Sequence, residues 1–273
     1  MEFEALFKLD RQVALVTGGG GVLGSAMARG LAQAGATVVL LGRTLAKVEQ
    51  VAAEIKAAGG EALPLSADVT SRADLEGARQ TILDKYGRLD ILLNAAGGNH
   101  PAALTRPDQS LFDLPQEGIN FVFELNFYGT FLPCQIFGQV MAQQKEGVII
   151  NISSMAALKP LTRVPIYAAA KSAVTNFTQW LAVYMAQEYS PAIRVNAIAP
   201  GFFIGEQNRR LLTHEDGSLT PRGQSIISHT PMGRFGDPED LIGTTLWLAS
   251  PASKFVTGIV APVDGGFAAF GGV

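Results

Sequence analysis

The chain has 273 residues, with 21 basic and 24 acidic side chains and a formal charge of −3 at pH 7. Charged residues make up only 16% of it and hydrophobic residues 48%, so the chain can bury enough apolar surface to offset its ordering entropy, which excludes an intrinsically disordered protein. The acidic balance, without a block of Lys and Arg, argues against a nucleic-acid partner, because phosphate binding needs clustered cations.

Cysteine and histidine are too scarce for a disulfide framework or a metal centre. The single cysteine, Cys134, excludes an internal disulfide, and we interpret it as a small buried hydrophobic residue. The 3 histidines are not clustered, so we expect no metal site. The first residues carry acids and no apolar core, and no run of about 18 apolar residues follows, so we expect neither a signal peptide nor a membrane span. A soluble, cytoplasmic protein is the expectation.

Two kinds of element alternate along the chain. Short apolar runs predict buried strands, and longer amphipathic runs predict helices. The strands are expected at 13–17, 37–41, 62–69, 90–98, 147–154, 193–201 and 255–266, and the helices at 24–35, 45–60, 71–87, within 112–144, at 167–189 and at 237–250. Gly35 and the Gly59-Gly60 pair are typical helix ends. Ser71 is a typical N-cap, and Asp237 before Pro238 predicts a second one.

This alternation predicts an α/β fold with a doubly wound parallel sheet. The strands are continuously apolar, as expected when both faces of a sheet are covered by helices. No linker or composition break divides the chain, so we expect a single domain over 1–273. Two irregular stretches, 98–118 and 201–236, are candidate loops for binding a substrate.

The first strand runs directly into TGGGGVLG, residues 17–24, and then into a helix. Glycines at this place let backbone N–H groups approach a pyrophosphate, which the positive end of the helix favours. The alternative is a tight strand-to-helix turn without a ligand, which would hardly need four glycines. The position favours a dinucleotide site.

The end of the second strand indicates which dinucleotide. An acidic residue there would accept hydrogen bonds from the ribose 2′-OH of NAD, but the sequence has Gly42-Arg43. A guanidinium can grip a 2′-phosphate, so we expect NADP(H) to be favoured over NAD(H). The alternative is that Arg43 faces solvent and contacts no cofactor.

Ser154, Tyr167 and Lys171 form the candidate catalytic set. Tyr167 and Lys171 are four residues apart and share one face of a predicted helix, where an ammonium is expected to lower the phenol's pKa. Ser154 ends the preceding strand at the same edge of the sheet, and its hydroxyl is expected to polarise a substrate carbonyl. A solvated lysine near a core tyrosine is the alternative that the spacing alone leaves open.

The ordered motifs resemble the classical short-chain dehydrogenase/reductase family over essentially the whole chain. They are TGGGGVLG from Thr17, Asp68, NAAG from Asn94, Asn126, Ser154, YAAAK from Tyr167 to Lys171, and Pro200-Gly201. The resemblance implies a Rossmann-type domain, usually tetrameric, that transfers hydride between NAD(P) and an alcohol/ketone pair. It departs at Val22, where the family has glycine, and Gly21 is expected to supply the backbone freedom instead.

The resemblance also implies roles for individual residues. Tyr167 would be the general acid/base and Ser154 would orient the carbonyl. Lys171 would bind the nicotinamide ribose, and Asn126 would hold a proton-relay water. Asp68 and Val69 would contact the adenine. The cofactor-binding residues expected in all are Gly18, Gly20, Gly21, Val22, Leu23, Gly24, Arg43, Asp68, Val69, Asn94, Ala95, Ala96, Gly97, Tyr167, Lys171, Pro200 and Gly201.

The loops resemble the subgroup assigned as D-mannonate oxidoreductase (fructuronate reductase). A sugar-acid substrate needs a cation for its carboxylate and polar groups for its hydroxyls. The candidate substrate-binding residues are Asn99, His100, Ser154, Arg163, Gln207, Asn208 and Arg209. The alternatives are that Arg209, with Arg210, only solvates a helix and that His100 is a surface or packing residue.

Three functions remain in view. The first is NADP(H)-dependent reduction of a sugar-acid ketone, such as fructuronate to mannonate, or the reverse oxidation. The second is the same chemistry on another small carbonyl substrate, such as a gluconate, a polyol or a 3-ketoacyl thioester. The third is a non-catalytic nucleotide sensor, which would be expected to lack some of the proton-transfer residues. Aromatic residues at helical spacing, Phe177, Trp180 and Tyr184, are either core or a subunit interface.

Overall fold

The computed structural model describes residues 3–205 and 209–272. Within these residues, one parallel sheet has the strand order β3-β2-β1-β4-β5-β6-β7. The strands are β1 (Val13–Thr17), β2 (Thr37–Gly42), β3 (Ala62–Ser66), β4 (Ile91–Asn94), β5 (Gly147–Ile152), β6 (Ile193–Pro200) and β7 (Val260–Val263). The predicted doubly wound α/β fold is confirmed, and β7 is shorter than the expected run of 255–266.

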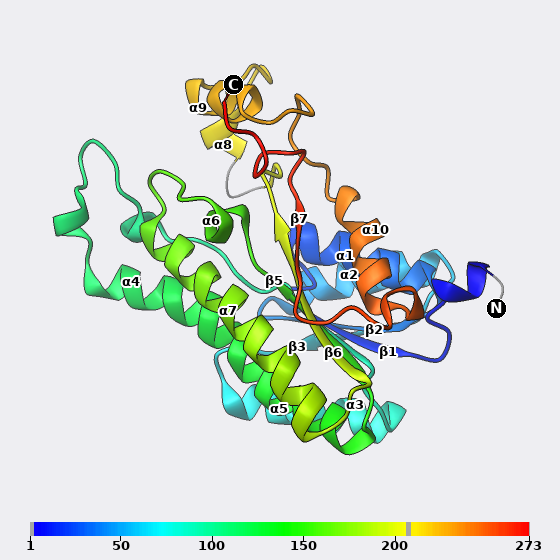
Figure 1. Ribbon diagram of the computed structural model, residues 1–273. Helices are drawn as coiled ribbons and strands as arrows, with labels where there is room; N and C mark the ends of the chain where they lie inside the picture. Colours follow the sequence, from blue (N-terminus) through cyan, green and yellow to red (C-terminus); the bar gives the residue numbers. More distant parts are fainter. Residues whose placement is uncertain (1–2, 206–208, 273) are drawn as a thin grey trace.

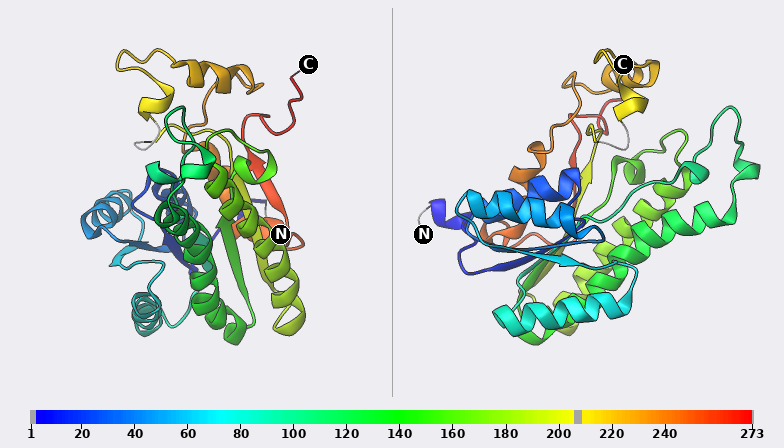
Figure 2. Two further views of the ribbon diagram at one scale, coloured as in Figure 1. Left: turned by 90° about the vertical axis from the view of Figure 1, so that its left-hand side faces the viewer. Right: turned by 180° about the vertical axis from the view of Figure 1, so that it is seen from behind.

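Helices cover both faces of the sheet (Figures 1 and 2). On one face a core cluster unites the sheet with α1 (Val22–Gln33), α2 (Leu45–Ala57) and α10 (Asp240–Ala249). On the other a second cluster includes α3 (Arg72–Tyr86), α5 (Gly129–Gln144) and α7 (Pro165–Glu188). The continuously apolar strands follow from this, because a strand between two helical layers has no face in water.

The edges of the sheet differ from its centre. Every residue of β1, β4, β5 and β6 is buried, whereas most residues of β3 and β7 are partly exposed. Each edge strand contains a proline, Pro64 in β3 and Pro262 in β7. A proline cannot donate a ladder hydrogen bond, so an edge strand is where a sheet tolerates it.

Three of the predicted helix boundaries are confirmed. The Ser71 side chain accepts a hydrogen bond from the Asp74 N–H and caps α3. Gly35 and Gly59 follow α1 and α2 with positive φ angles of 102° and 86°, the backbone conformation in which glycine commonly ends a helix.

The predicted N-cap at Asp237 is wrong. The α10 helix begins at Asp240, and a turn precedes it in which the Asp240 N–H bonds the Asp237 carbonyl. The Asp240 carboxylate accepts a hydrogen bond from the Asp237 N–H and pairs with Arg234 at 2.6 Å. The acid that organises this end of the helix is therefore Asp240, one turn later than predicted.

The predicted helical region 112–144 is interrupted at a place that matters for the site. It contains α4 (Gln116–Phe123), a π-helical turn η4 (Glu124–Tyr128) and then α5. Asn126 lies inside the π turn and is fully buried. Such turns place one extra residue in a helix and are frequent at functional sites.

The two candidate loops are less irregular than the sequence predicts. The 98–118 stretch contains short 3-10 helices, η2 (Pro101–Ala103) and η3 (Leu111–Asp113), and the start of α4. The 201–236 stretch contains α8 (Arg209–Leu212) and α9 (Pro221–Ser228). Figure 1 shows α8 and α9 above the carboxyl ends of the strands, with the C-terminal segment beside them.

The strand order reverses between β1 and β4, where β1 has β2 on one side and β4 on the other. Connections leave to opposite sides of the sheet at such a point and open a crevice at its carboxyl edge. Among the described residues, no helix combines the length and apolarity that a membrane crossing requires. The cytoplasmic location stays a prediction.

Candidate active site

The glycine segment forms the turn from β1 into α1. Gly18 has a positive φ of 65°, and the Gly21 N–H bonds the Gly18 carbonyl at 2.9 Å to close the turn. Gly24 packs directly against Gly18, because a Cβ at Gly24 would collide with the Gly18 carbonyl oxygen. The turn therefore needs Gly18 for its backbone conformation and Gly24 for close packing.

Gly21 behaves differently from the expectation. Its φ of −85° is open to any residue, so it does not replace the missing family glycine through backbone freedom. Gly21 is instead the N-cap of α1, and no side chain caps the helix there. The first N–H groups of a helix lack partners within the helix, so the turn offers them, together with the positive end of the dipole, to an anion.

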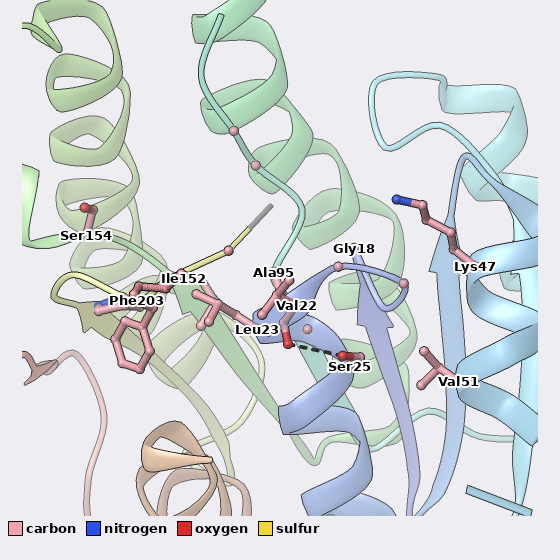
Figure 3. A pocket seen from close by; sticks show the side chains of 18 of the residues that line it. Gly18, Val22, Leu23, Ser25, Lys47, Val51, Ala95, Ile152, Ser154 and Phe203 are labelled. Carbon is pink, nitrogen blue, oxygen red and sulfur yellow. Dashed lines mark hydrogen bonds between the residues drawn. The ribbon is translucent and has the colours of Figure 1, made fainter. Parts of the chain in front are cut away.

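A cleft of about 580 Å³ runs from this turn along the carboxyl edge of the sheet. Figure 3 shows Gly18, Val22 and Leu23 between Lys47 on one side and Ser154 on the other. Small-molecule and cofactor pockets occupy roughly 300–1,000 Å³. The expected cofactor residues on its wall are Gly18, Gly20, Gly21, Val22, Leu23, Gly24, Ala95, Gly97, Tyr167, Lys171, Pro200 and Gly201.

Ser154, Tyr167 and Lys171 meet at one end of the cleft. Ser154 is the N-cap of α6 (Met155–Leu158) and accepts a hydrogen bond from the Ala156 N–H at 3.1 Å. Tyr167 and Lys171 occupy the first two turns of α7, with the Lys171 Nζ 5.8 Å from the centre of the Tyr167 ring. The Lys171 ammonium donates to the Ile152 carbonyl at 2.7 Å, which joins α7 to the end of β5.

The acidities of the pair differ from the sequence expectation. Burial raises the pKa of Tyr167 above its ordinary value, and a hydrogen bond with Ser154 opposes this rise. Burial also lowers the pKa of Lys171 from 10.5 to about 8. The expected net lowering of the Tyr167 pKa is therefore not found, because burial disfavours the phenolate more than the hydrogen bond with Ser154 favours it.

Asn126 fixes the backbone at this end of the cleft. Its side-chain amide donates to the carbonyls of Gly98 and Val122 at 2.7 and 2.8 Å, and its Oδ1 accepts from the Gly98 N–H at 3.1 Å. A Cβ on Gly97 would lie 2.8 Å from that Oδ1 and 3.2 Å from the Lys171 Nζ. Gly97 therefore has to lack a side chain for Asn126 and Lys171 to approach the cleft.

Arg43 lies at the opposite end of the site. It is exposed and lines a smaller cavity of about 210 Å³ beside the glycine turn, together with Gly42, Lys47 and Ala96. Lys47, in the first turn of α2, lines both this cavity and the main cleft. The two cations give this end a positive character suited to a phosphate group.

Three of the expected adenosine contacts line neither cavity. The Asn94 side chain is buried and donates to Asn151 Oδ1 at 2.9 Å, so it points into the sheet. Asp68 accepts hydrogen bonds from the Thr70 N–H and hydroxyl, and Val69 is buried. Their roles beside the cofactor stay predictions.

Of the expected substrate residues that the structure describes, only Ser154 lines the cleft. The Asn99 Oδ1 accepts from the His100 N–H, and His100 caps η2 through its Nδ1. Arg163 is exposed before α7 and Arg209 is exposed at the start of α8. Gln207 and Asn208 lie outside the described residues.

Several residues of the site are missing from the sequence prediction. Lys47 follows no recognisable motif, and the wall formed by Phe202, Phe203, Ile204 and Gly205 follows Pro200-Gly201 as an ordinary apolar run. Of these residues, only Phe202 and Phe203 could have been found from the sequence, because they directly continue the predicted strand that ends in Pro200-Gly201.

The residues present fit a nicotinamide dinucleotide and offer nothing suited to a metal. The uncapped start of α1 and the nearby cations Arg43 and Lys47 suit the phosphates of the cofactor. Gly97 presents a surface without a side chain, which suits a flat ring. Over the part of the chain that the structure describes, no three His, Cys, Asp or Glu side chains are grouped as metal ligands.

Comparisons with known proteins agree with this geometry. A family model described as short chain dehydrogenase matches residues 12–216. The uncharacterized oxidoreductase UxuB of Bacillus subtilis is 51% identical over 274 positions, covering 97% of this chain and 98% of its own. A protein of Haemophilus influenzae assigned as a D-mannonate oxidoreductase, crystallised with bound NAD, has a TM-score of 0.91 and 43% identity with full coverage of both chains, 100% each. A Burkholderia cenocepacia gluconate 5-dehydrogenase in complex with NADP and tartrate has a TM-score of 0.87 and 32% identity, covering 98% of this chain and 99% of its own.

The buried Lys171 makes stability depend on pH. Its pKa of about 8 in the folded protein lies below its ordinary 10.5, so the burial penalty is fully present below pH 8 and is lost as pH rises toward 10.5. Between pH 7 and pH 9.5 we expect the difference in unfolding free energy between wild type and Lys171→Met to move by about 2 kcal/mol in favour of wild type, measured by urea denaturation. The exposed Lys56, changed to Met, should show no such movement, and a constant difference for Lys171→Met would contradict the assignment.

Proposed function

Because the chain belongs to the short-chain dehydrogenase family, whose members here are oxidoreductases that use nicotinamide cofactors, we propose that it transfers hydride between NADP(H) and a sugar-acid ketone/alcohol pair such as fructuronate and mannonate. The observation that carries this proposal is the meeting of Ser154, Tyr167 and Lys171 at one end of a cleft whose other end is the glycine turn. A cofactor laid along the cleft would bring its reactive ring to the side chains that handle protons.

The chain's own residues account for the proton transfer. When bound, the dihydronicotinamide supplies a hydride, which carries two electrons to the carbonyl carbon. The Ser154 hydroxyl accepts from Ala156 through its oxygen, and its hydrogen, directed at Tyr167 in the structure, turns to the carbonyl oxygen of a bound substrate. As negative charge develops on that oxygen, the Tyr167 O–H bond breaks and its proton passes to the substrate.

Lys171 then restores the tyrosine. With a pKa of about 8, its ammonium gives up a proton to the phenolate far more readily than an exposed lysine would. We place the relay water at Asn126, because its Oδ1 and the Lys171 Nζ both approach Gly97, 2.8 and 3.2 Å from where a Cβ there would lie. The oxidation of the alcohol runs through the same positions in reverse, with Tyr167 as the base.

Two observations support a sugar acid as the substrate. The Haemophilus influenzae relative carries the D-mannonate assignment, and the Burkholderia cenocepacia relative is a gluconate 5-dehydrogenase. Arg163 and Arg209 are exposed cations, and the 98–118 stretch, with the polar residues Asn99 and His100, is joined to Arg163 by the Thr105 N–H. The second candidate is another small carbonyl substrate handled by the same residues. A nucleotide-sensing protein is the weakest reading, because all the proton-transfer residues are present.

A homotetramer is our proposal for the assembly. It is implied by the family, and the surface of α5 and α7 supports it. Trp180 and Tyr184 stack at 4.8 Å between ring centres and are 56% and 37% exposed, beside a groove of about 750 Å³ between α3, α5 and α7. Exposed aromatic clusters of this kind commonly mark an interface.

Changing Tyr167 tests the activity and the mechanism together. Purified wild-type protein is expected to oxidise NADPH when fructuronate is added, and Tyr167→Phe is expected to lose at least about 100-fold in kcat while binding NADPH unchanged, because only the transferable proton is removed. The readout is NADPH absorbance, with fluorescence titration for binding. Undiminished turnover would refute the mechanism, and no wild-type turnover despite cofactor binding would refute the substrate.

Changing Arg43 tests the cofactor preference. Arg43→Ala is expected to weaken NADPH binding by roughly 10- to 100-fold and NADH binding by much less, because only NADPH carries the 2′-phosphate. Fluorescence titration of both cofactors measures this, and Lys56→Ala is the control for the lost charge. Equal losses for both cofactors, or wild-type turnover that favours NADH, would overturn the preference.

Light scattering tests the assembly. At micromolar concentration the protein is expected to have four times the mass of one chain, and Trp180→Glu is expected to reduce that mass, because a carboxylate cannot be buried unpaired in an apolar interface. A monomeric wild-type protein would contradict the proposal.

A further inference from the structure

Three consecutive residues at the end of β5 each contact α7, the helix that carries Tyr167 and Lys171. The Ile152 carbonyl accepts from the Lys171 ammonium at 2.7 Å, and the Ser154 hydroxyl bonds Tyr167. Ser153 lies between them and is only 1% exposed. It takes no part in the proposed chemistry, and yet its side chain makes two hydrogen bonds to the same helix.

The Ser153 hydroxyl links a main-chain and a side-chain group of α7. Its Oγ lies 3.3 Å from the Lys171 carbonyl oxygen and 2.6 Å from the Thr175 Oγ1. The carbonyl can only accept and a hydroxyl has one hydrogen to donate, so Ser153 donates to Lys171 and Thr175 donates the shorter bond to Ser153. On the other side, the Ser153 N–H donates to the Ile198 carbonyl of β6 at 2.8 Å. Ser153 therefore joins α7 to the centre of the sheet.

A second pair of side chains repeats the arrangement one turn further along α7. The Asn151 side-chain amide donates to the Thr178 Oγ1 at 2.9 Å, and both residues are fully buried. Asn151 and Ser153 are two residues apart on a strand and so project to the same face of the sheet. Lys171, Thr175 and Thr178 are spaced by four and three residues, which places them on one face of the helix. The end of β5 and the first half of α7 therefore meet along a line of polar groups.

The polar character of these contacts points to position rather than to stability. A buried hydrogen bond replaces bonds to water, so apolar side chains of the same shape would hold the helix about as firmly. A hydrogen bond, however, weakens steeply when its length or angle changes. Two such bonds, one turn apart, fix the rotation of α7 and its place along β5 more narrowly than apolar contacts would.

The bond of the Lys171 ammonium to the strand cannot supply this constancy by itself. In the proposed mechanism the ammonium passes a proton to the Tyr167 phenolate, and a neutral amine is a weaker hydrogen-bond donor than an ammonium. The hydroxyls of Ser153 and Thr175 carry no charge before or after that step. Their bond therefore keeps its strength while the one beside it changes.

We propose that Ser153 and Thr175 are positioning residues, which hold the first turns of α7 on β5 while Lys171 changes its protonation state. This inference rests on the proposed function and adds to it two residues that act through Tyr167 and Lys171. Without their bond, α7 would also adopt positions in which the Tyr167 hydroxyl lies too far from Ser154 and from a carbonyl bound there. A displacement of about 1 Å at reacting groups can cost roughly 100-fold in rate.

Two substitutions of Thr175 separate its hydrogen bond from its packing. Thr175→Val keeps the volume and loses the hydroxyl, whereas Thr175→Ser keeps the hydroxyl and loses a methyl group. With NADPH saturating, Thr175→Val is expected to lower the single-turnover rate with fructuronate roughly 10-fold with little change in KM, and Thr175→Ser to stay within about twofold of wild type. A packing role would reverse this order. The reversed order, or an unchanged rate in Thr175→Val, would overturn the proposal.

A matched control and a double variant complete the kinetic test. The buried Thr245 donates its hydroxyl to the Leu241 carbonyl within its own helix, α10, so Thr245→Val removes the same group and is expected to leave the rate unchanged. Ser153→Ala is expected to lower the rate at least as far as Thr175→Val, and combining the two to cost no more than Ser153→Ala alone, because the side chains share one bond. Additive losses would contradict the pairing. Circular dichroism confirms that each variant folds.

Hydrogen exchange separates this inference from the proposed function. Exchange of the backbone amides of 165–178, followed by mass spectrometry on the protein without ligands, needs no turnover. It is expected to be roughly 5-fold faster in Thr175→Val than in wild type, and unchanged in Thr175→Ser and Thr245→Val. Without wild-type turnover of fructuronate the proposed function fails, and exchange still decides whether the pair holds the helix. Unchanged exchange in Thr175→Val would refute the inference even if fructuronate were reduced.

Discussion

The hydrogen bond from the Lys171 ammonium to the Ile152 carbonyl fixes the geometry on which the site depends. It attaches the first turns of α7 to the last residue of β5, so that Tyr167, one turn earlier on the helix, comes beside Ser154, two residues beyond the strand. The ammonium is almost fully buried and has one carbonyl as its hydrogen-bond partner in the described structure. The burial that comes with this position also lowers its pKa to about 8, so the placement of the ammonium and its acidity have the same cause.

Much of the fold could be predicted because each element carries its own local signal. The central strands are apolar throughout, and Gly35, Gly59 and Ser71 mark helix boundaries through backbone and capping preferences that act within a few residues. The Asp237 prediction failed because it rested on a local capping preference, which does not distinguish between two carboxylates three residues apart. In the structure the Asp240 carboxylate, at the first residue of α10, accepts from the Asp237 N–H and pairs with Arg234, and the local sequence does not reveal these contacts.

The candidate site divides in the same way. The glycine turn, Ser154 and the Tyr167–Lys171 pair are contiguous or regularly spaced, and the structure brings them to one cleft. Lys47 is an ordinary helix residue, and its place in the site comes only from the glycine turn beside which α2 packs. The direction of the Tyr167 pKa shift could not be read from its spacing to Lys171 either, since it depends on burial and on the hydrogen bond with Ser154.

The π turn at Glu124–Tyr128 sets a limit on how this chain can change in length. An α-helix advances roughly 100° per residue, so deleting one residue here would restore a continuous helix without breaking its backbone hydrogen bonding. The side chains of the turn itself would change direction, which would carry the Asn126 amide away from Gly98. A deletion that leaves the helix intact would therefore break the contact between Asn126 and Gly98 that supports this end of the cleft. We expect relatives to keep the length of this turn and to vary in length in the exposed part of the 98–118 loop.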